Sequence, residues 1–279
     1  MGFVKTAEEI AKIQAVLAAS RFVNFENVVV DFLTTPETVA NCLPPGLEPV
    51  DEPRVKALVG RWQSNCVGDF YGGAIYLAAK HGDLEGDYVL AMYMDRDQPI
   101  IYGRELFGEP KKQATSLMHR NGDCYAGFVD RHGTRLIELA VNASNDAGAS
   151  RGPGVNFNYK ATPSITGAGV EFDRALLTVA EFDMNIKVHR TGEGKVRLGG
   201  TPHDPLSDIE VVSILGGAYL EGDLYTTARP LLEVSGEAFL PYLHGRNDDW
   251  SLLNTEVSAF RAPSDAIRQP NSRKDREAQ

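Results

Sequence analysis

Residues 100–112 read IIYGRELFGEPKK. The apolar first part of this stretch predicts a strand, which breaks at Gly108-Glu109-Pro110 and leads to Lys111 and Lys112. Because the preceding segment is too apolar to lie on the surface, we expect the two lysines to be partly desolvated. Two ammonium groups held together in such surroundings disfavour each other's charge, which lowers a lysine pKa from about 10.4 toward neutrality. A neutral amine is a nucleophile for carbonyl carbon and forms a Schiff base.

At these residues the chain resembles the acetoacetate decarboxylase family, whose pattern is Gly-Arg-Glu, a short spacer and Pro-Lys-Lys. The similarity runs in the same order from about residue 24 to residue 243. It is carried by Leu43–Glu48, Gly86–Tyr88, Met92-Tyr93, Gly103–Glu105, Pro110–Lys112, Arg190–Gly192 and Asp204–Asp208. The resemblance implies an α+β, mainly β fold, in which a curved antiparallel sheet or β-barrel carries a few flanking helices.

The bulk composition is that of an ordinary globular protein, with 279 residues, 43% hydrophobic and 24% charged. The formal net charge is −10 and no basic patch is interleaved with aromatic residues, so we expect neither nucleic acid nor a membrane as partner. Three scattered cysteines and the lack of a secretory signal favour the cytoplasm. We expect a single domain over residues 1–262 and a polar, disordered tail over 263–279.

Two helices and a set of antiparallel strands are expected along the chain. Thr6 and Glu9 form a capping box for a helix to about Ser20, and Thr35-Pro36 begins a second helix. From about residue 55 the alternation of side chains predicts β structure. The expected segments are a strand over 88–94, a hairpin over 124–141, a strand over 182–188 that turns back at 191–194, and a loop over 142–154 that borders a pocket mouth.

The resemblance also implies the catalytic residues. Lys111 corresponds to the Schiff-base nucleophile and Lys112 to the residue that perturbs its pKa. No cofactor is expected, because the lysine imine takes that role. The six histidines show no metal-binding spacing, so no metal site is expected. Related proteins are homo-oligomers, and we expect the same here.

The chain departs from the family at three positions. Members of the family complete the site with an arginine and two glutamates. Alignment puts Phe25 at the arginine position and Leu58 and Phe70 at the glutamate positions, although a shift of one residue would offer Asp69 in place of Phe70. Apolar groups at these positions would leave a larger and more apolar cavity, so we expect a substrate larger than acetoacetate.

Each of the remaining candidate residues has two possible roles. Arg104 and Glu105 match the family, either as a structural ion pair or backbone anchor or as catalytic groups. Glu109 lies two residues before Lys111, so it either points away or acts as an acid/base group. Met92 and Tyr93 either pack in the core or line the pocket.

Three functions follow from these residues. The first is a carbon–carbon lyase that decarboxylates a β-keto acid, such as a released polyketide or aromatic acyl chain of secondary metabolism. The second is a Schiff-base aldolase, dehydratase or cyclase acting on a pyruvate-like keto acid. The third is a β-barrel protein that binds a small molecule without catalysis, which the intact Pro110–Lys112 motif disfavours.

Overall fold

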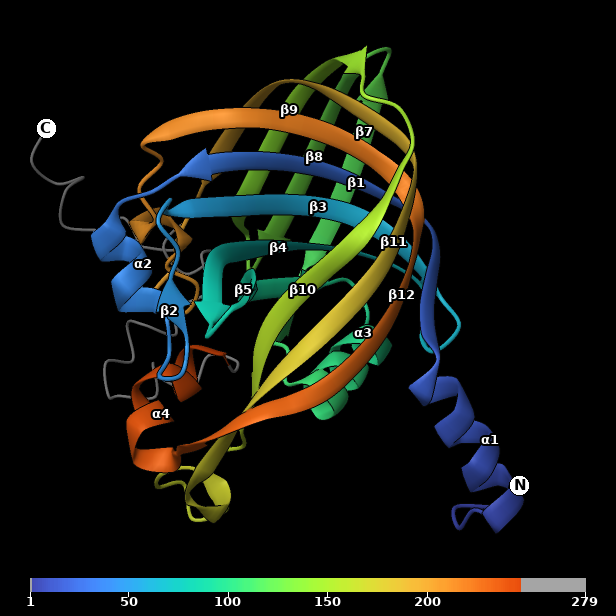
Figure 1. The fold of residues 1–279 in the computed structure, drawn as a ribbon, viewed down its shortest axis with the longest axis vertical. Helices are drawn as coiled ribbons and strands as arrows, with labels where there is room; N and C mark the ends of the chain where they lie inside the picture. The colour runs from blue at the N-terminus through green and yellow to red at the C-terminus, as the bar shows by residue number, and fades with distance from the viewer. Residues whose placement is uncertain (1, 247–279) are drawn as a thin grey trace, which may run out of the picture. The chain divides into compact units, whose positions relative to one another are not determined.

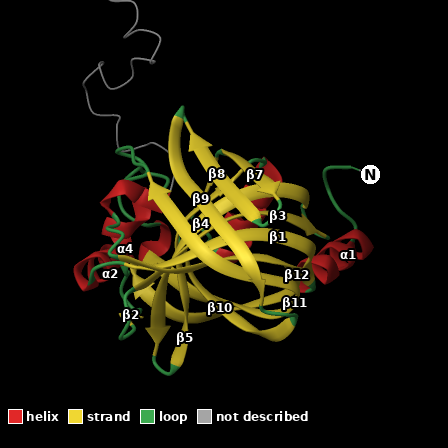
Figure 2. Ribbon diagram, turned by 90° about the horizontal axis from the view of Figure 1, so that it is seen from above, coloured by secondary structure: helices red, strands yellow, loops and turns green. Residues whose placement is uncertain are grey.

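A computed structural model describes residues 2–246, which fold into one twelve-stranded sheet with short helices around it (Figures 1 and 2). The expected mainly β architecture is confirmed. The predicted domain end at residue 262 and the tail over 263–279 lie outside the described residues.

The helices are α1 (Ala7–Ala18), α2 (Pro36–Cys42), α3 (Asp97–Tyr102) and α4 (Gly236–Leu243). The strands are β1 (Ser20–Leu33), β2 (Glu48–Pro49), β3 (Arg54–Ser64), β4 (Gly68–His81), β5 (Leu84–Met94), β6 (Lys111–Gln113), β7 (Thr115–Asn121), β8 (Cys124–Arg131), β9 (Thr134–Asp146), β10 (Ser150–Lys160), β11 (Arg174–Leu198) and β12 (Ser213–Ser235).

Seven of the strands close into a barrel. Their order is β10-β5-β4-β3-β1-β12-β11, and β10 also pairs with β11, so that the two ends of the series meet. Most of these pairings are antiparallel, but β10 joins β5 in parallel. Strands β9, β8 and β7 continue the sheet from β11 beyond the point of closure (Figure 1). The barrel is therefore one part of a longer sheet that folds back over it.

Several barrel strands are buried on both faces. On β1, Val28, Val30 and Phe32 are fully buried and belong to the main core, which includes side chains of β8, β9 and α4. The alternate residues Phe25 and Val29 face the inside of the barrel. A strand that is covered on both faces by apolar groups does not show a clean polar and apolar alternation. This two-sided burial separates an outer core from an inner cavity.

The two N-terminal helices begin as predicted. Thr6 caps α1 in a capping box with Glu9, and the side chain of Thr35 caps α2, which has Pro36 in its first turn. Among residues 2–246, no helix combines the length and the apolar character needed to cross a bilayer.

The expected strand at Ile100 is wrong. Residues 97–102 form helix α3, and Gly103–Phe107 continue it as a π-helical turn. Pro99 is compatible with this helix because it lies in the first turn, where backbone N–H groups have no partner within the helix. The turn ends at Gly108, whose φ of +77° is left-handed and which packs against the backbone of β10.

Two further expectations about the β segments are also wrong. Residues 191–194 do not form a turn, because β11 runs unbroken from Arg174 to Leu198 between β12 and β9. Gly192 allows β9 to come close, since a Cβ there would overlap the carbonyl oxygen of Asn142. The loop expected over 142–154 is limited to residues 147–149 between β9 and β10. Ser150, at the start of β10, does border the cavity.

Candidate active site

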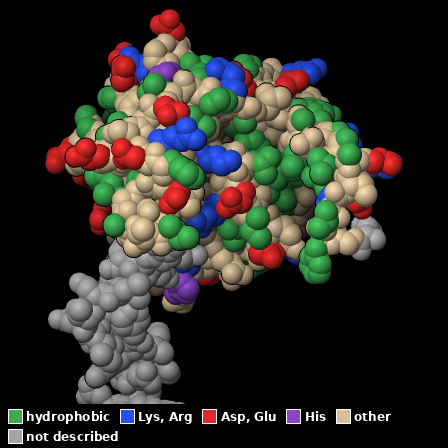
Figure 3. All heavy atoms as spheres, turned by 90° about the horizontal axis from the view of Figure 1, so that it is seen from below, with side chains coloured by type: hydrophobic (Ala, Val, Ile, Leu, Met, Phe, Trp, Pro, Cys, Tyr) green, Lys and Arg blue, Asp and Glu red, His purple; other side chains and the backbone are tan. Residues whose placement is uncertain are grey.

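The inside of the barrel holds a cavity of about 630 Å³. Its wall is mostly apolar and includes residues from β1, β3, β4, β5, β10, β11 and β12. Lys111, the predicted nucleophile, and Glu109 are among the ionisable residues that line it. A space-filling view of the lower face shows hydrophobic side chains lining a hollow, with charged side chains beside it (Figure 3).

Strand pairing places Lys111 midway along the barrel wall. Strand β6 lies parallel to β5, and Lys111 begins a row of directly paired residues that runs across the neighbouring strands. The paired positions in this row are Lys111, Met92, Ala74, Leu58 and Val29. All five side chains line the cavity. The sequence of β6 therefore directs the first lysine of the pair into the barrel.

The amine of Lys111 is buried and paired with a carboxylate. Lys111 is 5% exposed, and its Nζ lies 2.6 Å from Oε2 of Glu109. Gly103 makes room for this pair, because a Cβ at that position would lie 2.6 Å from Nζ of Lys111 and would overlap the Glu109 carboxylate. The structure excludes the alternative in which Glu109 points away from the lysine.

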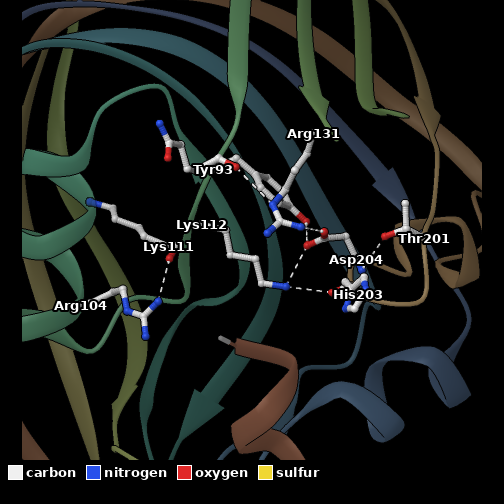
Figure 4. A network of polar contacts seen from close by, with 9 residues as sticks. Tyr93, Arg104, Lys111, Lys112, Arg131, Thr201, His203 and Asp204 are labelled. Carbon is white, nitrogen blue, oxygen red and sulfur yellow. Dashed lines mark hydrogen bonds and ion pairs between the residues drawn. The ribbon is translucent and has the colours of Figure 1, made fainter. Parts of the chain in front are cut away.

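Lys112 points to the opposite side of β6 (Figure 4). Its Nζ donates to Oδ1 of Asp204 at 2.9 Å and to the carbonyl oxygen of His203 at 2.8 Å. Arg131 pairs with the other carboxylate oxygen of Asp204 at 2.7 Å, and the Tyr93 hydroxyl donates to Oδ1 at 3.0 Å. The expectation that the two ammonium groups crowd each other is not met, because successive side chains of a strand point to opposite faces.

One half of the cavity, on the side of Phe25, is aromatic. The rings of Trp62 and Phe70 stack with their centroids 5.5 Å apart, and Phe22 meets Phe70 edge to face at 6.4 Å. Leu220 packs against the same group. This half can hold an apolar or aromatic group by burial and ring contacts.

The other half of the cavity carries charged groups. Lys56 pairs with Asp87, and its Nζ lies 5.9 Å from the centroid of the Tyr76 ring. Asp31 is opposite Lys56 in the strand register, and burial raises the pKa of its carboxyl against the opposing effect of Lys56 and Arg54. Burial also raises the pKa of Tyr76, and Glu109 adds to this increase. At neutral pH the Tyr76 hydroxyl is therefore a neutral hydrogen-bond donor.

The structure brings only some of the predicted residues to the cavity. Phe25, Leu58, Phe70 and Met92 line it together with Glu109 and Lys111. Tyr93 does not, because it faces the Asp204 group in the outer core. Asp69 also lies outside, where both its oxygens accept from Arg61.

Arg104 and Glu105 do not line the cavity either. The guanidinium of Arg104 donates to the carbonyl oxygen of Lys111 at 3.4 Å, which corresponds to the backbone anchor among the predicted alternatives. Glu105 is exposed on the π-helical turn. Neither side chain is placed to touch a substrate bound at Lys111.

Sequence reasoning missed three groups. Asp204 and Arg131, the buried partners of Lys112, come from distant segments. Asn27, which lines the cavity, follows Phe25 at the spacing of a strand face, and that alternation was a usable signal. Among residues 2–246, no three His, Cys, Asp or Glu side chains form a metal-binding arrangement.

A second depression, of about 1040 Å³, is more open to solvent. It lies over parts of β9, β11 and β12 and shares Asp31, His189 and Ala218 with the cavity. None of the residues predicted for the site lines it. Lys111 therefore belongs to the barrel interior and not to this depression.

The protein is a closed β-barrel with a buried, ion-paired lysine in its cavity. Similarity to known proteins assigns its family. A family model described as "Acetoacetate decarboxylase (ADC)" matches residues 10–234. The chain belongs to the acetoacetate decarboxylase family.

Individual relatives agree with this assignment. A protein named acetoacetate decarboxylase from Burkholderia cenocepacia is 29% identical over 212 residues, which cover 73% of this chain and 84% of the relative. The fold is similar to the crystal structure of acetoacetate decarboxylase from Legionella pneumophila, with a TM-score of 0.70, 22% identity, and coverage of 77% and 88% of the two chains. It is also similar to the enduracididine biosynthesis enzyme MppR, complexed with the condensation product of pyruvate and imidazole 4-carboxaldehyde. That match has a TM-score of 0.67 and 18% identity, and covers 76% of this chain and 88% of MppR.

Proposed function

We propose that the protein is a Schiff-base-forming decarboxylase that acts on a β-keto acid larger than acetoacetate. The observation that carries this proposal is the Lys111–Glu109 pair, with its 2.6 Å contact inside a mostly apolar cavity. Lys111 is only 5% exposed. Burial of a lysine amine is unfavourable, so it is found where the amine has a specific partner or a specific reaction.

The chemistry uses Lys111 as nucleophile and Glu109 as proton carrier. Glu109 accepts a proton from the Lys111 ammonium, and the free amine attacks the ketone carbon of the substrate. Glu109 returns the proton to the resulting hydroxyl, which leaves as water and gives the protonated imine. The bond to the carboxylate then breaks, its electron pair moves toward the imine nitrogen, and carbon dioxide departs. Protonation of the enamine carbon and hydrolysis of the imine release the ketone and the lysine.

The aromatic half of the cavity supports a large acyl group. Phe25, Leu58 and Phe70 line the wall where other members of the family have an arginine and two glutamates. An apolar pocket also destabilises a carboxylate relative to a transition state in which the charge is spread. We propose a polyketide-type or aromatic acyl substrate of secondary metabolism, and a cytoplasmic homo-oligomer as the working form.

A second candidate is a Schiff-base aldolase, dehydratase or cyclase that acts on a pyruvate-like keto acid. Two observations favour it. Glu109 is within proton-transfer distance of the Lys111 amine, and the charged half of the cavity offers Lys56 and Arg54 to a carboxylate that is retained. The product bound to MppR is a condensation product of pyruvate with an aldehyde.

Borohydride trapping tests the shared step and carbon dioxide release separates the two candidates. Incubation with a β-keto acid or pyruvate and borohydride should add the reduced adduct mass to the peptide that contains Lys111, and Lys111→Ala should lose both adduct and turnover. Release of carbon dioxide from a β-keto acid identifies a decarboxylase. Loss of pyruvate that depends on an aldehyde, without carbon dioxide, identifies an aldolase. An adduct on another lysine only, or full turnover by Lys111→Ala, would refute Lys111 as the nucleophile.

A further inference from the structure

Asn27 is a buried polar residue in the aromatic half of the cavity, where Thr226 is another buried polar side chain of the lining. It is 6% exposed, it lines the cavity, and its Oδ1 has no hydrogen-bond partner among the described residues. A buried amide oxygen without a hydrogen-bond partner is unfavourable. A ligand that supplies a donor to this oxygen would therefore be bound more tightly.

The neighbouring strand is shaped to accept this side chain. Asn27 pairs with Gly60 of β3, and a Cβ at Gly60 would overlap Oδ1 of Asn27 and lie 2.7 Å from the carbonyl oxygen of Glu26. Glycine is therefore needed at residue 60 for the amide to lie against the wall.

The register fixes where Asn27 lies relative to Lys111. Val29 belongs to the row of Lys111, and Asn27 is two residues further along β1, in the direction of Phe25. Two residues of a strand span about 7 Å. The row of Asn27, which includes Gly60 and Gly72, lies between the row of Lys111 and the pair Phe70–Trp62. A chain that is attached to Lys111 and extends toward the aromatic half therefore passes the level of Asn27 on the cavity wall.

We infer that Asn27 determines specificity by hydrogen bonding to an oxygen-bearing group on the acyl chain of the substrate, a few carbon atoms beyond the reacting ketone. This inference rests on the proposed function and narrows its substrate class to β-keto acids whose chain carries a hydroxyl or a second keto group. The amide suits either, because rotation about its last bond presents an acceptor oxygen or a donor NH₂ group.

The test compares two substrates in three proteins. The substrates are six-carbon β-keto acids that differ only by a hydroxyl group on the δ carbon. For the wild type we expect kcat/KM to be about tenfold higher for the hydroxylated acid, which corresponds to one net hydrogen bond. Asn27→Leu should lose this preference, so that the ratio of the two kcat/KM values falls toward one. An unfolded or weakened protein would lower both rates together, so a changed ratio reports specificity.

Asn158→Leu is the matched control. Asn158 is another fully buried asparagine, its amide also has no partner among the described residues, and it does not line the cavity. This variant should keep the wild-type ratio. Gly60→Ala, which displaces the Asn27 amide, should lower the ratio like Asn27→Leu.

Other outcomes separate this inference from the proposed function. Equal kcat/KM values for the two acids in the wild type, or an unchanged ratio in Asn27→Leu, would mean that Asn27 meets only water, and would overturn the inference alone. If neither acid is turned over, calorimetric binding of the two corresponding methyl ketones tests Asn27 independently. A preference for the hydroxylated ketone that Asn27→Leu removes would support the inference even if decarboxylation fails, and its absence would overturn it.

Discussion

The carboxylate of Glu109 lies 2.6 Å from the amine of Lys111. In the proposed chemistry its oxygen accepts the proton that the amine must lose before it attacks a carbonyl group, and returns it to the departing hydroxyl. This role can be measured, because removal of the carboxylate removes the proton carrier.

Glu109→Gln should lower kcat by about 100-fold, since a positioned proton carrier contributes at least that factor. Steady-state rates of the variant and the wild type check this loss. Glu105→Gln, an exposed neighbour on the π-helical turn, is the control and should match the wild type. A Glu109→Gln enzyme with wild-type kcat would exclude Glu109 from proton transfer.

Asp31 provides a pH test of the charged half of the cavity. Burial raises the pKa of its carboxyl above 3.8, so the ionised form is less favourable in the folded protein than in the unfolded chain. Stability therefore falls as the pH rises through 3.8 toward the higher folded value, and the loss persists at neutral pH. Asp31→Asn cannot ionise and should have a higher Tm than the wild type at neutral pH. The difference should shrink as the pH falls toward 3.8, and a lower Tm at neutral pH would contradict the assignment.

At the scale of elements, the three-residue strand β6 connects the cavity to the outer core. Lys111 faces the cavity, while Lys112 is held by Asp204 in a segment 92 residues away. We expect the position of Lys111 to depend on this ion-pair group on the other face of the strand, with Lys112 as a positioning residue.

Asp204→Asn should lower the free energy of unfolding by about 3 to 5 kcal/mol, because it leaves Lys112 and Arg131 buried without their counter-charge. Urea denaturation measures this change. Glu233→Gln is the control, since its ion pair with Arg174 is exposed and should contribute less than about 1 kcal/mol. A small effect of Asp204→Asn, comparable to that of the control, would show that the group does not hold β6 in place.

The directions of the side chains on β5 and β6 follow from strand geometry, and the sequence could have revealed them. Adjacent residues of one strand cannot share a face, so Met92 and Tyr93 cannot both line the pocket, and neither can Lys111 and Lys112. The resemblance located Lys111 correctly in a cavity wall. The partner Asp204 could not be found from spacing, because only the tertiary fold brings it to β6.

At the scale of the whole molecule, the barrel encloses a volume that exceeds the needs of acetoacetate. Each methylene group buried in the aromatic half should contribute about 0.8 kcal/mol, or roughly fourfold in affinity. We expect kcat/KM to rise with chain length or aromatic size across a series of β-keto acids, with acetoacetate poor. Steady-state rates of carbon dioxide release measure the series. Turnover of acetoacetate equal to or better than that of every longer acid would refute the proposed role of Phe25, Leu58 and Phe70.

The sequence predicted the secondary structure of some segments better than that of others. The hairpin around His132-Gly133 has clear turn residues and was predicted well. The long strand β11 was not, because Gly192 and Gly194 resemble a turn in sequence while in the fold they permit close strand contact. The helix at Ile100 was missed because a short apolar run fits a buried strand and a buried helix equally well.

The pairing of β1 with β12 has a consequence for how the protein is made. Of the strands described in residues 2–246, β1 (Ser20–Leu33) is synthesised first, yet one of its two neighbours is β12 (Ser213–Ser235), which is synthesised after the others. The barrel cannot close before β12 has been made, and one edge of β1 stays unpaired until then. Such an edge is a site for aggregation of nascent chains. Chains truncated before residue 213 should therefore be recovered with chaperones or as aggregates, and the cavity should form only after β12 has been synthesised.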